Sequence, residues 1–368
     1  MRKVLFVATV DSHIRTFHLP YLKLLHEAGY EVHVATNGDE QFPYCDVKHQ
    51  ICIERSPFKL NNIKAIKQLK KIIDEEKFDI VHCHTPMGSV VARLASKNAR
   101  KKYCTRVIYT CHGFHFYKGS AIKNWILFYP IERFLAKYTD TLITINMEDY
   151  LLAKNKFGKK CKDINYLPGI GVDNSKFNLK ISDKEKKQLL NELKLNEHDF
   201  IIIYPARLCP DKNQLLLINL MKELDNKNIK LLLPGKDEYN GYYQKYVKEN
   251  NIKNVFFLGL RDDISKLLNI SNLLIASSIR EGFGINLVEA LASNVPVIAV
   301  DNRGHREIVD DGVNGFIIKN NLEDLIDRFN MIYNDKDLYN KLKSNGYKSV
   351  RKYFLDNSLK EMKNIYNI

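Results

Sequence analysis

Short apolar runs rich in β-branched residues alternate with helical stretches along most of the chain, and this alternation restricts the fold more than any other feature. The sequence predicts strands over 4–9, 31–36, 80–83, 107–111 and 142–146, and again over 200–205, 230–234, 255–258, 273–277 and 295–300. Helices are predicted over 61–76, 125–137, 214–224, 243–251 and 338–354. Strands that alternate with helices are typical of parallel sheets. The sequence therefore predicts an α/β fold with two similar halves.

The length supports two domains, because 368 residues exceed what one ordinary hydrophobic core accommodates. We place the boundary in the turn Pro168-Gly169-Ile170-Gly171-Val172-Asp173, where glycines and a proline follow a strand. The predicted domains are 1–170 and 171–345. Residues 346–368 are predicted to form a C-terminal helix that packs on the first domain.

Charged residues gather around the predicted strand ends of the second half, where ligands bind in open parallel sheets. Arg207 and Lys212 follow the strand over 200–205, and Glu281 and Glu289 flank the start of an apolar helix over 285–292. A helix N-terminus next to glycines favours an anion, and arginine and lysine add the positive charge that a diphosphate needs. A surface ion pair or a solvated helix face would explain any one of these residues alone. Together they indicate a sugar-nucleotide site, with the diphosphate between a sugar at Glu281 and a ribose at Glu289.

Several short motifs occur in one order: Ala206-Arg207-Leu208 with Lys212, Pro234-Gly235, Val255 to Gly259, the two glutamates, Pro296 to Ala299, and Glu307 followed by Asn314-Gly315. With these motifs the segment 200–318 resembles the donor-binding domain of the family 4 glycosyltransferases. The resemblance implies the GT-B architecture, in which two Rossmann-like domains face each other across a cleft and the last helix crosses back to the first domain.

The resemblance also implies roles for individual residues. The catalytic set is His112, Glu281, Arg207 and Lys212. The donor is expected to contact Arg207, Lys212, Gly235, Arg261, Glu281, Gly282, Phe283, Gly284, Ile285, Asn286 and Glu289. The acceptor is expected to contact His13, His18, His115 and Tyr117. Transfer with retention of the anomeric configuration is implied, without a bound metal.

The histidines of the first half follow predicted strands. His112 lies in Thr110-Cys111-His112-Gly113 and matches the histidine that family members place beside the transferred sugar. In His82-Cys83-His84 the two histidines share one strand face. Because the sequence shows no third ligand beside them, packing or a loop hydrogen bond is favoured over a metal site.

One stretch departs from the family pattern. Many members follow their first strand with a glycine-rich loop, whereas residues 9–20 contain no glycine. We expect a loop here that faces the cleft, and the donor contact of those glycines is not carried over. The only short Asp-x-Asp motif, Asp335-Lys336-Asp337, lies in the helical tail, so no metal is assigned to it.

Positive charge is concentrated in the first half, which holds 27 Lys and Arg against 17 Asp and Glu over residues 1–175, a net +10 of the total +14. The sequence contains no recognised nucleic-acid module, so an anionic membrane surface is the favoured partner. Candidate contacts are Lys64, Lys67, Lys70, Lys71, Lys77, Lys97, Arg100, Lys101 and Lys102.

The first apolar run is too short for a signal peptide. Seven scattered cysteines indicate no disulfide framework. A cytoplasmic protein bound peripherally to the inner membrane face is expected.

The resemblance implies a retaining enzyme that moves a hexose or N-acetylhexosamine from a nucleotide sugar, favoured as UDP-linked, to a lipid-diphosphate-linked saccharide in capsule or exopolysaccharide assembly. No cofactor besides the co-substrate is expected. Three alternatives remain: a GDP-mannose-dependent mannosyltransferase, a nucleotide-sugar 2-epimerase, and a sugar-nucleotide-binding protein without turnover.

Overall fold

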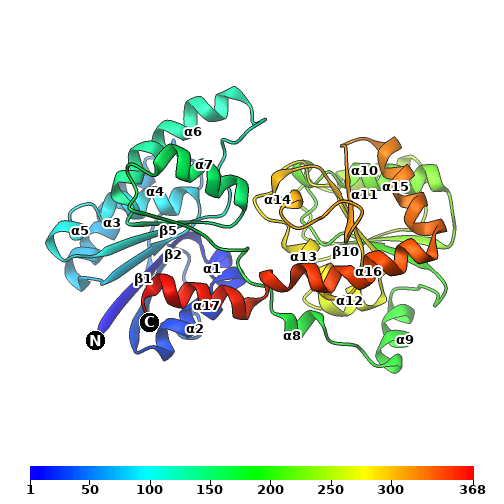
Figure 1. Ribbon diagram of the computed structural model, residues 1–368, viewed down its shortest axis with the longest axis horizontal. Helices are drawn as coiled ribbons and strands as arrows, with labels where there is room; N and C mark the ends of the chain where they lie inside the picture. The colour runs from blue at the N-terminus through cyan, green and yellow to red at the C-terminus, as the bar shows by residue number, and fades with distance from the viewer. The chain divides into compact units, whose positions relative to one another are not determined.

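The computed structural model describes all 368 residues (Figure 1), and its contacts divide the chain into two compact units. Unit 1 holds Met1–Ile170 together with Ser358–Ile368, and unit 2 holds Gly171–Asn357. The chain leaves unit 1 within the turn 168–173 that the sequence singled out. Each unit is a parallel sheet with helices packed on its faces.

The sheet of unit 1 has seven parallel strands in the order β3-β2-β1-β4-β5-β6-β7. They are β1 (Arg2–Val10), β2 (Tyr30–Asn37), β3 (Val47–Gln50), β4 (Ile80–Cys83), β5 (Arg106–Cys111), β6 (Thr141–Thr144) and β7 (Asp163–Tyr166). The chain adds β2 and β3 on one side of β1 and the remaining strands on the other. The strand order therefore reverses between β1 and β4, where the loops that follow these two strands separate and leave room for a ligand.

Helices cover both faces of this sheet. They are α1 (Asp11–Phe17), α2 (Leu19–Glu27), α3 (Asn61–Glu76), α4 (Pro86–Ala95), α5 (Ala99–Lys102), α6 (Ile122–Leu135), α7 (Met147–Phe157) and α17 (Leu355–Tyr366). In β1, Leu5 and Val7 belong to the core that includes α3, α4 and α7, whereas Val4 and Phe6 belong to the core that includes α1, α2 and α17. Burial on both faces explains why the strand is a continuous apolar run.

The end of the chain differs in detail from the prediction of one helix over 346–368. Residues 346–350 complete α16 (Lys336–Val350), which packs on α13 (Ile285–Ala292) in unit 2. A 3-10 turn over Arg351–Tyr353 follows α16, and Phe354 then has extended backbone and forms a β-bridge with Val172. Only α17 crosses back to unit 1. There the Tyr366 hydroxyl lies 2.7 Å from His82 Nδ1.

The sheet of unit 2 has six parallel strands in the order β10-β9-β8-β11-β12-β13. They are β8 (Phe200–Ile203), β9 (Ile229–Pro234), β10 (Val255–Gly259), β11 (Leu273–Ala276), β12 (Val297–Val300) and β13 (Gly315–Ile318). The other helices are α8 (Asn174–Phe177), α9 (Asp183–Glu192), α10 (Gln214–Leu224), α11 (Tyr242–Glu249), α12 (Ile264–Ile270), α14 (Arg303–Arg306) and α15 (Leu322–Asn334). The strand order reverses between β8 and β11, which places a second switch point there.

The stretch 9–20 is not the loop that the sequence suggested. Residues 9 and 10 complete β1, α1 begins at once with Asp11, and α2 follows with Pro20 in its first turn. An acidic residue in the first turn of α1 complements the helix dipole. Ile14 anchors α1 in the core. No helix of the structure is both long and apolar enough to span a membrane.

Candidate active site

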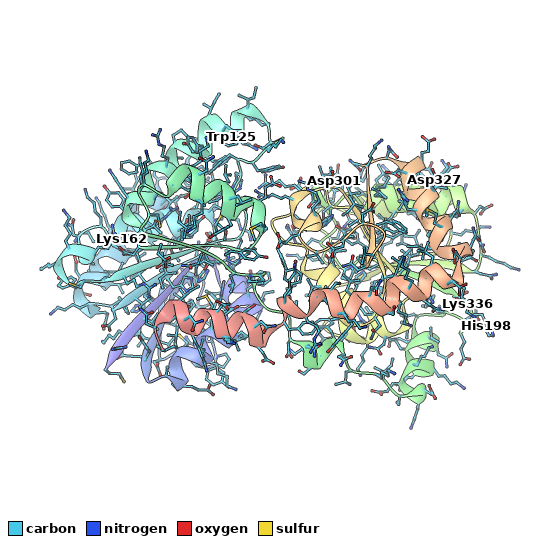
Figure 2. All side chains as sticks on the ribbon, viewed as in Figure 1. Trp125, Lys162, His198, Asp301, Asp327 and Lys336 are labelled. Carbon is cyan, nitrogen blue, oxygen red and sulfur yellow. The ribbon has the colours of Figure 1, made fainter.

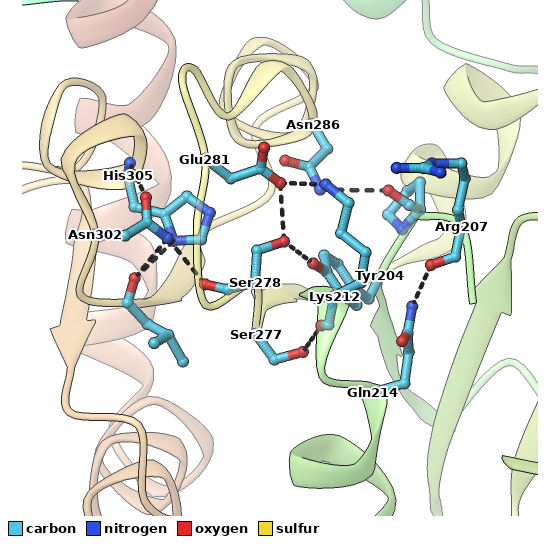
Figure 3. Close-up of polar contacts among 12 residues, drawn as sticks. Tyr204, Arg207, Lys212, Gln214, Ser277, Ser278, Glu281, Asn286, Asn302 and His305 are labelled. Carbon is cyan, nitrogen blue, oxygen red and sulfur yellow. Dashed lines mark hydrogen bonds and ion pairs between the residues drawn. The ribbon is translucent and has the colours of Figure 1, made fainter. Parts of the chain in front are cut away.

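The switch point of unit 2 brings together the cation and the carboxylate that the sequence placed in one site (Figure 3). Lys212 ends a short 3-10 helix after β8, and Glu281 lies in the loop after β11. The Lys212 ammonium forms an ion pair with Glu281 Oε1. Their side chains are 20% and 19% exposed, so both remain accessible to a ligand.

The Glu281 carboxylate is held in place by two buried hydroxyl groups. Ser278 Oγ donates to Glu281 Oε1 at 2.8 Å, and the Tyr204 hydroxyl lies 2.5 Å from Ser278 Oγ. Burial raises the pKa of Tyr204 well above its usual range, so the phenol stays protonated and can donate. This chain of hydrogen bonds fixes one carboxylate oxygen before any ligand arrives.

Two glycines allow the strand-end loops to approach each other closely. A Cβ at Gly235, which follows β9, would lie 1.9 Å from the carbonyl oxygen of Ala206. A Cβ at Gly304 would lie 2.8 Å from Glu281 Cβ. Because no side chain fits at these distances, both positions require glycine, and Gly304 in particular keeps the Glu281 loop against the start of α14.

Asn302 and His305 support this loop, and the sequence analysis did not find them. Asn302 Nδ2 donates to the Ser278 carbonyl at 2.9 Å, and His305 Nδ1 donates to the Val300 carbonyl at 2.7 Å. Burial lowers the pKa of His305, which keeps the imidazole neutral. Both residues follow β12, so the rule that ligand sites lie at strand ends could have found them.

Two other predicted donor cations have carboxylate partners of their own. The Arg207 side chain is exposed and pairs with Glu238. The Gln214 side chain donates to the Arg207 carbonyl at 2.7 Å and thus steadies the loop. Arg261 binds both oxygens of Asp263 at 2.7 Å, and the structure does not bring it to Lys212.

The helix α13 has the bounds that the apolar run predicted, and Glu281 precedes it while Glu289 lies in its second turn. Asn286 Nδ2 donates to the Pro205 carbonyl at 3.3 Å and ties α13 to the loop after β8. Glu289 has no ion-pair partner, and burial raises the pKa of its carboxyl to about 8. The stretch from Gly282 to Gly284 connects Glu281 to the first residue of the helix, Ile285.

The loop ahead of α13 is also packed from the side. The ring of Phe283 lies 5.3 Å from the ring of Tyr353, with the two planes inclined at 69°. A Cβ at Gly284 would lie 2.9 Å from Leu287 Cδ1. The predicted donor-binding loop is therefore a firmly packed segment at the N-terminus of a helix, the kind of position that favours an anion.

Four histidines meet at the switch point of unit 1. His13 lies in α1, His18 between α1 and α2, His84 after β4, and His112 after β5. His13 Nε2 and His112 Nε2 are 3.3 Å apart, and the rings of His18 and His84 are 3.8 Å apart. Burial lowers the pKa of His13 to about 4 and the pKa values of the other three well below their usual range. These imidazoles are therefore neutral at physiological pH.

His82 borders this group, with its ring 4.2 Å from that of His84, whereas His115 and Tyr117 contact α6. His82 shares a strand face with His84, as predicted, and lies 2.8 Å from the Thr110 hydroxyl. The ring of His115 packs 4.5 Å from Phe128 of α6. The Tyr117 carbonyl oxygen accepts a hydrogen bond from Trp125 Nε1 of α6 at 3.2 Å.

Comparison with known proteins identifies the family of the chain. Residues 185–349 match the family described as Glycosyl transferases group 1, and residues 3–146 match the family described as Glycosyl transferase 4-like. EpsD of Bacillus subtilis (strain 168), which carries a glycosyltransferase name, is 44% identical over 100% of this chain and 96% of its own. An Escherichia coli UDP-Gal:alpha-D-GlcNAc-diphosphoundecaprenol alpha-1,3-galactosyltransferase is 27% identical over 83% of this chain and 80% of its own.

Solved structures show the same fold. The structure of HepE from Anabaena in complex with UDP and glucose has a TM-score of 0.80 at 19% identity, with 100% of both chains covered. WaaG, a glycosyltransferase involved in lipopolysaccharide biosynthesis, has a TM-score of 0.76 at 15% identity, with 99% of both chains covered. Two parallel-sheet units of this kind are the GT-B fold, and the chain is a glycosyltransferase that belongs to the group 1 family.

Proposed function

We propose that the protein transfers a hexose or N-acetylhexosamine from a UDP-sugar to a lipid-diphosphate-linked saccharide, with retention of configuration, in the assembly of a cell-surface polysaccharide. The observation that carries this proposal is the Lys212–Glu281 pair at the switch point of unit 2, next to the N-terminus of α13. A cation and a helix N-terminus suit a diphosphate, and a fixed carboxylate suits sugar hydroxyls.

In the proposed reaction the bond between the sugar C1 and the diphosphate oxygen breaks, and its electron pair leaves with the diphosphate. Arg207, Lys212 and the N-terminus of α13 stabilise this departing charge without a metal ion. A hydroxyl of the acceptor bonds to C1, and its proton passes to the departing diphosphate. Glu281 holds the donor sugar, Glu289 holds the ribose, and His112 positions the sugar. Donor contacts at Gly235, Arg261, Gly282, Phe283, Gly284, Ile285 and Asn286 are part of the same proposal.

The choice of UDP and of a lipid-linked acceptor is supported by relatives. The Escherichia coli relative is named for a UDP-galactose donor and a lipid-diphosphate acceptor, and the HepE structure holds UDP. Acceptor contacts are proposed at His13, His18, His115 and Tyr117. Two of the alternatives differ in their products. A 2-epimerase releases no nucleotide in proportion to added acceptor, and a binding protein releases none at all.

We also propose that unit 1 docks on an anionic membrane surface, and α6 is the element that best supports this. Ile122 and Ile126 are 77% and 71% exposed, while Trp125, labelled in Figure 2, packs toward the core on the same helix. A surface helix that exposes large apolar side chains while packing others on the core is suited to a second apolar environment. Lys123 and Arg133 are exposed on α6 and would face anionic headgroups.

Part of the basic cluster that the sequence suggested is already neutralised. Lys70 pairs with Asp74, Lys71 with Glu75, and Arg100 with Asp140. The apolar and basic surface of α6 therefore supports membrane docking better than those lysines do.

Acceptor-dependent release of nucleotide tests the reaction. The purified protein is incubated with UDP-, GDP-, ADP- and dTDP-sugars, with and without a prenyl-diphosphate-linked saccharide, in the presence of a chelator. We expect UDP release only when both a UDP-sugar and the acceptor are present, and a product whose anomeric proton shows the donor's configuration by NMR. Release of GDP from GDP-mannose would favour the mannosyltransferase, and acceptor-independent conversion of the donor would favour the epimerase.

Sedimentation with phosphatidylglycerol vesicles tests the docking. Replacing both Ile122 and Ile126 by Glu should weaken vesicle binding by at least about tenfold, because two apolar side chains lose their insertion and two negative charges appear. Met331→Glu, at an exposed apolar position of unit 2, is the matched control and should bind like the wild type. Equal binding of all three proteins would contradict the role of α6.

A further inference from the structure

His13, His18, His84 and His112 form a compact group that we call the histidine cluster. One ring nitrogen from each lies within 4.8 Å of the corresponding nitrogen of every other member. The four side chains come from segments far apart in the sequence, and only the strand order of unit 1 brings them to its switch point. Four imidazoles whose nitrogens come this close together form a candidate metal ligand set.

Two members of the histidine cluster are buried without partners. His18 is 2% exposed and His84 is 0% exposed, and none of their ring nitrogens forms a hydrogen bond. A neutral imidazole carries one donor and one acceptor, and leaving both unsatisfied in the interior costs free energy. Native proteins rarely leave such groups unpaired, so the arrangement indicates a bound species that the chain itself does not supply.

The other two members are close enough to hydrogen-bond to each other, and the distance between them is also compatible with a shared tetrahedral ion. His13 Nε2 and His112 Nε2 are 3.3 Å apart. Two nitrogens bound to a tetrahedral zinc ion at about 2.0–2.1 Å lie about 3.3 Å from each other. Neutral imidazole is a ligand for zinc, copper, nickel and iron, whereas calcium and magnesium prefer oxygen ligands.

A small cavity beside the histidine cluster explains how the remaining nitrogens could be satisfied. Its volume is about 10 Å³, close to the minimum that one water molecule needs. Its lining includes His18, His84, His82 and Thr110. A metal-bound histidine commonly uses its second nitrogen to bond a water or another polar group. One water in this cavity could serve His18 or His84 in that way.

We propose that the histidine cluster binds one divalent transition-metal ion of the zinc type, with one ring nitrogen from each of the four histidines as ligands. This site lies in unit 1, away from the Lys212–Glu281 pair, and goes beyond the proposed transfer reaction, which uses no metal. Because His13, His18 and His112 are also proposed contacts of the acceptor or the sugar, a bound ion would compete with that reaction. The sequence offered only His82 and His84 as a pair here, and His84 is the one that joins the cluster. A metal ion bound to His112 Nε2 would prevent that nitrogen from forming a hydrogen bond with a sugar hydroxyl.

A second group of candidate ligands shows the contrast. Glu31, His33 and Glu76 also lie close together in unit 1. There the Lys3 ammonium is 2.6 Å from Glu76 and 3.4 Å from Glu31, and His33 bonds to His49 and Glu31. Because a lysine already occupies that group, it needs no ion, and we assign none to it.

Titration with cobalt tests the proposal, since Co²⁺ takes the place of Zn²⁺ and has visible absorption that reports its coordination. The protein is prepared without a polyhistidine tag, stripped with a chelator, dialysed and titrated with Co²⁺. We expect one equivalent to bind with the strong visible bands of a four-coordinate ion, one equivalent of Zn²⁺ to remove them, and Mg²⁺ to have no effect.

Variants assign the site. His84→Gln and His112→Gln should each lower the affinity for Co²⁺ by about 100-fold or more, since each removes one of four ligands. His26→Gln in unit 1 and His198→Gln in unit 2, both at exposed positions (His198 is labelled in Figure 2), are controls and should bind like the wild type. Circular dichroism and the thermal midpoint show whether each variant folds.

Three results would overturn the proposal: no stoichiometric binding of Co²⁺ or Zn²⁺ by the folded wild type, six-coordinate spectra, or unchanged affinity in folded His112→Gln. Any of these would mean that the histidine cluster is not a four-ligand metal site. Should His84→Gln fail to fold, His112→Gln decides the question, because His112 is only partly buried and follows a strand end.

Discussion

The two sheets reverse their strand order at equivalent places, yet the side chains gathered there differ in charge. At the switch point of unit 2 lie a lysine, an arginine and two glutamates, whereas at that of unit 1 lie four neutral histidines. The fold provides the same location twice, and the loops decide the chemistry. Charged loops suit a diphosphate, and neutral donors and acceptors suit sugar hydroxyls or a metal.

The two regions also differ in how their groups are satisfied without a ligand. In unit 2 the cations are paired, Lys212 with Glu281 and Arg207 with Glu238. A diphosphate must therefore take these cations from carboxylates that are already there. In unit 1, the ring nitrogens of His18 and His84 have no hydrogen-bond partner. On binding a ligand, the cations of unit 2 would exchange carboxylate partners for the diphosphate, whereas the histidines of unit 1 would gain partners that they lack.

The largest expected effect is on turnover, and it comes from removing the cation at the switch point of unit 2. Lys212→Ala should lower kcat/KM by about 10²–10³-fold, because the departing diphosphate loses a positive charge at the point where its own charge develops. The measurement is UDP release in the presence of acceptor and chelator. Lys245→Ala, which removes an exposed lysine paired with Glu249, should stay within about twofold of the wild type. Near-normal turnover by folded Lys212→Ala would show that the Lys212–Glu281 pair does not take part in the transfer reaction.

A second prediction concerns the histidine expected at the sugar. His112→Ala should lower kcat/KM by about 10²-fold while the Kd of UDP changes less than twofold, since the nucleotide is expected to bind unit 2 only. Turnover assays and calorimetric titration with UDP measure the two quantities. A large loss of UDP affinity in this variant would show that the division of roles between the units is wrong.

A third prediction uses Glu289 and pH. Burial raises the pKa of this carboxyl to about 8 in the folded protein, against 4.5 in an unfolded chain, so the folded state holds the extra proton. Stability of the ligand-free protein should then fall as pH rises from about 5 to 8. Glu289→Gln removes this contribution, and with these two pKa values the wild type should lose about 3 kcal/mol more than the variant over that range. Urea unfolding at pH 5 and pH 8 measures the difference.

The control for this experiment is Glu249→Gln, at an exposed helix position of the same unit. It should show the same pH dependence as the wild type. If Glu289→Gln also follows the wild type, the carboxyl is not desolvated and its proposed place beside the ribose loses support.

The smallest expected effect concerns the exposed pair of Arg207. Glu238→Gln frees the guanidinium from its carboxylate and should strengthen UDP binding by less than about 1 kcal/mol, because exposed ion pairs contribute little. Calorimetric titration measures the change. A tenfold weakening would mean that Glu238 itself contacts the donor.

Much of the architecture could be predicted because strong local patterns determine it. The helices over 61–76, 214–224 and 285–292 have the predicted bounds, and each predicted strand is present with small differences at its ends. The missed strands are β3, β7 and β13, which all lie at the edges of their sheets. An edge strand has one neighbour and partial exposure, so it needs no long apolar run.

The candidate sites were predictable in part for a related reason. Lys212 and Glu281 were recognised because both follow strands that meet at a switch point. The histidine cluster was not recognised, since His13, His84 and His112 come together only through the order of β1, β4 and β5. A sequence shows which residues follow strands, but the strand order decides which of those residues meet.

Thermal stabilisation by nucleotides tests most directly the claim that a sugar nucleotide binds at the switch point of unit 2. A ligand at 100 times its Kd stabilises the native state by about 2.7 kcal/mol. We predict that UDP raises the Tm of the wild type and of Lys245→Ala more than GDP, ADP or dTDP does, and that Lys212→Ala loses the shift. No shift with any nucleotide, or an equal shift in Lys212→Ala, would contradict the account.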